Sequence, residues 1–88
     1  MFPFNKILYE SFEKNGFEYE CVISPKEEQS TYNEFQVQFH VILKMPRQSN
    51  YIRFMLFSTG DGHWQPDEKR IIDPWIADAI GRIIIENF

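Results

Sequence analysis

Three side chains that could hold a divalent metal ion fall within seven residues of one another: Asp61, His63 and Asp67. Carboxylate oxygens and imidazole nitrogens bind such ions, and Gly60 and Gly62 would let the backbone approach an anion. Asp-Gly is first of all a turn former, however, and a lone Gly-x-Gly lacks the strand-to-helix context of a nucleotide-binding motif. The sequence therefore favours a turn here, and we expect no metal and no cofactor.

A cysteine–histidine pair is the second chemical candidate, because Cys21 and His40 could form a nucleophile and its base. Both residues lie in segments of alternating polarity, and the alternation directs Cys21 toward the core and His40 away from it. Cys21 is also the only cysteine, which excludes a disulfide within the chain. We expect Cys21 to be a small core residue.

Two neighbouring carboxylates, Glu18 and Glu20, share the polar side of the same segment. Close carboxylates can shift each other's pKa, as in acid–base catalysis. They would lie beside Gln36 and Gln38 if the two segments pair so that residue numbers sum to about 56. A solvated polar face is the favoured interpretation, and we expect no enzyme activity and no catalytic residues.

The charge is unevenly distributed along the chain. Residues 1–34 carry three Lys and seven Glu, for a net charge of −4, and residues 61–88 carry three basic and six acidic side chains, for −3. Residues 35–60 carry no acid and have a net charge of +3, and Tyr51 lies among them. Such a basic segment could contact a nucleic acid, although an ordinary solvated turn is favoured. The alternative nucleic-acid contacts are Lys44, Arg47 and Arg53.

The elements that must position these residues begin with a predicted helix, from residue 3 or 5 to residue 15. Phe4, Ile7, Leu8 and Phe12 form an apolar stripe at helical spacing. The Asn-Gly pair at residues 15–16 suits the end of a helix.

Three strands are predicted next, over residues 17–24, 32–43 and 51–59, with polar connections at 24–30 and 44–50. The core-facing residues are odd-numbered in the second strand and even-numbered in the third. Paired residue numbers in that hairpin must therefore sum to an odd value, and 95 fits best. This register places Leu43 opposite Ile52 and Val41 opposite Phe54.

A C-terminal helix is predicted from Asp73 and Pro74, which suit the N-cap and first helical positions, to about Asn87. Residues 63–72 are irregular and could add one short strand. The predicted fold is a single α+β domain over residues 1–88, with order α-β-β-β-α, a meander of three or four antiparallel strands, and both helices on one face.

This element order is similar to that of double-stranded-RNA-binding domains. Those domains carry a lysine cluster at the start of the last helix, where it contacts phosphates. Here that position holds Asp73 and Asp78, so the charge has the wrong sign. Nucleic-acid binding through the basic hairpin is kept as the alternative function.

The sheet face turned away from the helices carries more apolar side chains than a solvated face needs, inside a polar rim. Trp75 and Ile85 could add to it or make a second site, whereas residues 63–72, which contain Trp64, could instead fold back and cover it. The predicted partner-binding residues are Val22, His40, Ile42, Tyr51, Arg53, Met55 and Phe57.

The longest unbroken apolar run has four residues, far fewer than a membrane-spanning helix needs, and residues 1–13 lack the features of a signal peptide. We therefore expect a cytoplasmic protein. The predicted function is a small non-enzymatic protein-binding module, such as an inhibitor, an immunity-type protein, an adaptor or an assembly subunit. Its partner would be another protein or a second copy of the chain.

Overall fold

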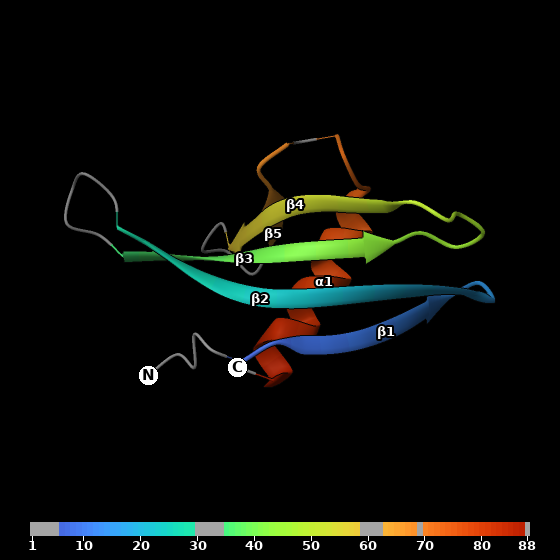
Figure 1. The fold of residues 1–88 in the computed structure, drawn as a ribbon, viewed down its shortest axis with the longest axis horizontal. Helices are drawn as coiled ribbons and strands as arrows, with labels where there is room; N and C mark the ends of the chain where they lie inside the picture. The colour runs from blue at the N-terminus through green and yellow to red at the C-terminus, as the bar shows by residue number, and fades with distance from the viewer. Residues whose placement is uncertain (1–5, 30–34, 59–62, 69, 88) are drawn as a thin grey trace.

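The computed structural model describes residues 6–29, 35–58, 63–68 and 70–87, which form one five-stranded antiparallel sheet and one helix (Figure 1). The strands lie in chain order, so each pairs with its neighbour in sequence. The helix crosses behind the strands, from the side of the last strands to the first (Figure 1). The elements are β1 (Leu8–Lys14), β2 (Phe17–Gln29), β3 (Phe35–Lys44), β4 (Tyr51–Ser58), β5 (Trp64–Pro66) and α1 (Pro74–Asn87).

The predicted N-terminal helix is wrong, and with it the α-β-β-β-α order, because residues 8–14 form strand β1; the first predicted positions, up to residue 5, lie outside the described residues. Leu8 and Phe12 are four residues apart, which places them on one face of a strand as well as on one face of a helix. They lie opposite Ile23 and Tyr19 of β2. The fold stays α+β and antiparallel, but α1 is the only helix in the described residues.

The Asn-Gly pair predicted to end a helix is the turn of the β1–β2 hairpin. Asn15 and Gly16 have φ angles of 55° and 81°. Positive φ at both central residues is the mark of the two-residue hairpin turn that favours Asn-Gly, because its twist matches that of the strands. The same dipeptide thus joins two strands here.

Strand β2 extends through Gln29, so the turn predicted over residues 24–30 is wrong for the part that the structure describes. Pro25 lies beyond Ile23, the last residue of β2 that pairs with β1, and a strand edge tolerates a residue without an N–H group. The β2–β3 register is also shifted from the prediction. Cys21 lies opposite Leu43, so the numbers sum to 64 and not to 56.

The predicted β3–β4 register is confirmed. Leu43 lies opposite Ile52, and Val41 lies opposite Phe54. The register holds because a slip of one residue would turn the whole apolar set of β4 to the other face. The polarity of the two strands was enough to define this hairpin.

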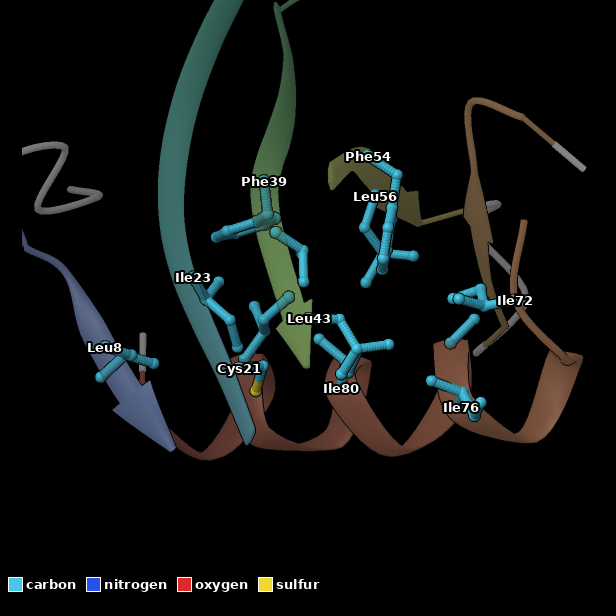
Figure 2. Packing of buried hydrophobic residues seen from close by; sticks show 13 residues of the cluster. Leu8, Cys21, Ile23, Phe39, Leu43, Phe54, Leu56, Ile72, Ile76 and Ile80 are labelled. Atoms are coloured by element: carbon cyan, nitrogen blue, oxygen red, sulfur yellow. The ribbon is translucent and has the colours of Figure 1, made fainter. Parts of the chain in front are cut away.

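The core lies between α1 and one face of the sheet, which we call the inner face (Figure 2). Figure 2 shows side chains from β1 to β4 and from α1 directed toward one another. The predicted start of α1 is confirmed, since the Asp73 carbonyl accepts hydrogen bonds from the N–H groups of Ile76 and Ala77, at 3.0 and 3.3 Å. The buried residues of α1 are Ile76, Ala77, Ile80, Gly81 and Ile84.

Of the described residues between β4 and α1, Trp64, Ile71 and Ile72 pack on the inner side. Residues 64–66 add the fifth strand beside β4, with Phe57 opposite Gln65. The Trp64 ring packs edge-on against Phe39, with 5.9 Å between ring centroids, and Ile72 is buried in the core. Trp64 and Ile72, which could have covered the other face of the sheet, therefore pack in the core instead.

Candidate functional site

The face of the sheet turned away from α1, here called the outer face, is the main candidate for function. The strand registers align its residues in rows that cross the sheet. The rows are Tyr9, Val22, Ile42 and Arg53; Ser11, Glu20, Lys44 and Tyr51; and Ser24, His40 and Met55.

Two tyrosines stand out on this face. Tyr9 is 76% exposed and Tyr51 is 61% exposed, whereas Val22, Ile42 and Met55 are half-buried by their neighbours. A hollow with a volume of about 520 Å³ lies between the tyrosines, on the β1–β4 part of the sheet. Its lining is Tyr9, Glu10, Ser11, Glu20, Cys21, Val22, Ile42 and Tyr51.

The structure brings the predicted partner-binding residues onto this one face. Val22, Ile42 and Arg53 share a row, and His40 and Met55 share the next. Phe57 follows Met55 along β4 at the next outward position and is half-buried.

Tyr9 is the residue that the sequence reasoning missed, because residues 8–14 were predicted to be helical. The Asn-Gly pair at residues 15–16, which favours a two-residue hairpin turn, was the signal for a strand, whereas Glu10 interrupts the apolar positions Leu8 and Phe12. With β1 in the sheet, Tyr9 lies next to Val22 and extends the outer face by one strand.

Trp75 does not belong to the outer face. Its ring packs edge-on against Phe12 and Tyr19 of the inner face, with centroid distances of 6.2 and 5.2 Å. Phe12 and Tyr19 are stacked at 5.0 Å, and the Lys14 ammonium lies 4.1 Å from the Trp75 ring centroid. Ile85, at 67% exposure, is on α1 and thus also away from the outer face.

The three basic residues proposed as nucleic-acid contacts have different surroundings. The Lys44 ammonium lies 3.8 Å from a carboxylate oxygen of Glu20. Arg47 is in the β3–β4 loop with φ of 62°, and its guanidinium lies 4.7 Å from the Phe17 ring centroid. Arg53 lies in the row of Ile42. The likeness to double-stranded-RNA-binding topology ends with the loss of the α-β-β-β-α order.

The structure separates the cysteine from the histidine of the candidate pair, and it separates the two glutamates from the predicted glutamines. Cys21 is 3% exposed in the core, and burial, with a smaller contribution from Glu10, raises its pKa to about 11. His40 lies in the outer-face row of Met55, on the opposite side of the sheet. Glu18 lies opposite Glu13, and Glu20 lies opposite Lys44, so neither faces the predicted glutamines.

Of the three candidate metal ligands, for which the sequence favoured a turn, the two that the structure describes have other contacts. Asp61 is outside the described residues. Asp67 accepts a hydrogen bond from the Met55 N–H at 3.1 Å, and His63 Nδ1 lies 3.6 Å from Asp78 Oδ2. Asp78 also accepts a hydrogen bond from the Trp64 N–H at 3.2 Å. Within the described ranges, no three side chains of the ligating types lie close enough to share an ion.

Among the residues with described positions, no helix is long and apolar enough to span a membrane. Comparison of the chain with protein-family models, with curated proteins and with solved structures finds no match.

Proposed function

We propose that this chain is a non-enzymatic protein-binding module that binds its partner on the outer face. The observation that carries the proposal is the one-sided cover of the sheet. In the part of the chain that the structure describes, α1 packs on the inner side (Figure 1), together with Trp64, Ile71 and Ile72. The outer face keeps two exposed tyrosines beside half-buried aliphatic side chains.

The composition of this face supports protein recognition. Tyr, Met, Phe and Arg are enriched in protein–protein interfaces, and charged residues are concentrated at their rims. Here Tyr9, Tyr51, Met55 and Arg53 surround Val22 and Ile42, while Glu13 and Glu18 lie at one end. The aliphatic centre would lose water on binding, and the tyrosines would supply contact area at a low entropic cost.

The backbone also suits a binding surface. Four long strands hold the outer-face residues on paired backbone, so the surface is formed before the partner arrives and little entropy is lost in ordering it. An inhibitor, an immunity-type protein, an adaptor and an assembly subunit would all use such a preformed surface.

The test is a double substitution, Met55→Glu with Phe57→Lys, that puts two charges on the outer face. We expect it to abolish self-association and partner recovery in affinity capture, because charged side chains resist desolvation. Ile85→Glu, on the exposed side of α1, is the matched control and should change neither. Circular dichroism must show that all variants stay folded.

Unchanged oligomeric state and unchanged partner recovery in the double variant would exclude the outer face as the binding surface. Retention of the wild-type chain on duplex RNA or DNA at physiological salt, lost with Arg47→Glu, would instead support the nucleic-acid alternative.

A further inference from the structure

We propose that the occupant of the outer face is a second copy of this chain, bound sheet to sheet with the strands aligned. The proposal rests on the proposed function and names the partner of that same surface. The two-fold axis would run along the strands, between β2 and β3. Sheets that pack face to face commonly keep their strand directions within about 30° of each other, which this arrangement satisfies.

The symmetry determines which residues meet. Rotation by 180° about such an axis keeps each row at its own level along the strands and reverses its order. Strand β1 then lies over β4 of the second copy, and β2 lies over β3. Each outer-face row therefore lies over the same row of the second copy, with its residues in the opposite order.

Two of the rows are complementary to the same row of the second copy read in the opposite order. In one row, Val22 would meet Ile42 of the second copy, so the aliphatic centre packs against itself, and the Tyr9 ring would meet Arg53. In the adjacent row, Glu20 would meet Lys44 of the second copy, and by symmetry Lys44 would meet Glu20. The charges in this row thus pair twice across the interface.

The acidic end of the face lies near the β3–β4 loop of the second copy in the same arrangement. Glu13 and Glu18 lie opposite each other at the β1–β2 end of the sheet, where two like charges would repel. The loop after β3, which contains Arg47, lies at the same end (Figure 1). The rotation brings that loop of the second copy toward the two carboxylates, but the Arg47 guanidinium lies over the Phe17 ring on the inner side, so this end adds no charge pair to the interface.

A two-fold axis that crosses the strands is less favourable. Placed at the row of Tyr9, Val22, Ile42 and Arg53, it would stack every residue on its own copy, so that Arg53 would face Arg53. It would also move Glu20 away from Lys44 of the second copy. The charge pattern therefore favours the axis along the strands.

The size of the face suits a small stable dimer. Four strands about 4.8 Å apart, with about ten residues each at a rise of about 3.3 Å, cover roughly 600 Å² in projection. The relief of the side chains adds to this area. A standard protein–protein interface buries about 800 Å² on each partner, so nearly the whole of the described outer face would have to be buried.

The experiment uses two charge reversals, Glu20→Lys and Lys44→Glu, alone and mixed. Both side chains are more than one-third exposed, so both variants should fold. Each variant alone should dimerise about tenfold more weakly than wild type, or worse, because the cross-interface pairs become repulsive. An equimolar mixture should form the heterodimer with near wild-type affinity, because every cross-interface pair is then of opposite charge.

The mixture separates contacts between copies from contacts within one chain. In each variant the local Glu20–Lys44 pair of its own chain is lost and stays lost after mixing, so only a contact between copies can restore affinity. Native mass spectrometry distinguishes the heterodimer from both homodimers, and sedimentation velocity gives the affinities. Glu86→Lys, on the exposed side of α1, is the control and should dimerise like wild type.

Two outcomes would overturn the proposal. A wild-type chain that stays monomeric at every concentration would exclude the second copy as occupant, while the proposed function would still be decided by partner recovery with the Met55 and Phe57 variant. A wild-type dimer whose charge variants show no preference for the heterodimer would exclude this packing of the two sheets.

Discussion

The stability of the fold depends on pH through the thiol of Cys21. The thiol has an ordinary pKa of 9.0, and burial raises it to about 11 in the folded chain. The unfolded chain loses the proton from about pH 9, while the folded chain keeps it to about pH 11. The contribution of Cys21 to stability is therefore fully present below pH 9 and is lost between pH 9 and 11.

Urea unfolding at several pH values checks this expectation. The free energy of unfolding of the wild type should fall more steeply between pH 9 and 11 than that of Cys21→Ala. Below pH 8 the difference between the two proteins should be constant. Parallel profiles up to pH 11 would show that the thiol is not desolvated as described.

Gly81 allows α1 to approach Trp64. A Cβ atom at this position would overlap the Trp64 ring at Cδ1, Cγ and Nε1. Replacing a helical glycine by alanine normally stabilises by about 1 kcal/mol, but overpacking costs about 1–3 kcal/mol. We expect Gly81→Ala to destabilise the fold by about 1 kcal/mol, measured as a lower urea midpoint at unchanged slope.

The smaller ring of Trp64→Phe should reduce the cost of Gly81→Ala, so the two substitutions should cost less together than the sum of each alone. A Gly81→Ala protein that is more stable than wild type would show that the helix does not lie this close to Trp64.

The β1–β2 hairpin packs on α1 through a cluster of three aromatic rings, those of Trp75, Phe12 and Tyr19. Because Trp75 packs inward, Trp75→Ala should lower the free energy of unfolding by about 2 kcal/mol or more. Lys14→Ala removes only the contact of a cation with the ring and should cost less than about 1 kcal/mol. Thermal and urea unfolding measure both.

The same pair of variants separates a core role from a binding role for Trp75. The structure predicts that Lys14→Ala leaves self-association and partner recovery unchanged. A Trp75→Ala protein of wild-type stability that fails to bind would contradict the inward packing of the ring.

The sequence predicted correctly the elements in which apolar residues recur at a spacing that suits only one kind of secondary structure. In β3 and β4 the alternation of Val41, Leu43, Ile52 and Phe54 determined both the strands and their register. For α1, Asp73 and Pro74 marked the start of the helix correctly. The outer face could be predicted because these two strands provide most of it.

The remaining elements have patterns that two structures can satisfy. Leu8 and Phe12 suit a helix and a strand equally, so pairing with β2 decided the outcome for β1. Pro25 and the charged residues after it read as a turn, but they lie where a strand edge tolerates them. Such tertiary pairing is not encoded in the polarity of residues 8–14 alone, and Tyr9 was missed for that reason.

For the whole molecule, the central feature is a sheet with its core on one side. The described helix α1 and Trp64 of β5 pack on the inner face of the sheet. The apolar residues Val22, Ile42 and Met55 lie on the outer face. A small protein seldom leaves a large apolar patch in contact with water, so the outer face is where binding to another chain is expected.

The most direct test of this account is the solution mass by light scattering over a concentration series, for the wild type and for the Met55→Glu, Phe57→Lys variant. The mass of the wild type should rise from 10.6 kDa toward twice that value as the concentration increases, while the variant stays at 10.6 kDa. A wild type and a variant of equal mass at every concentration would contradict an interface between copies on the outer face.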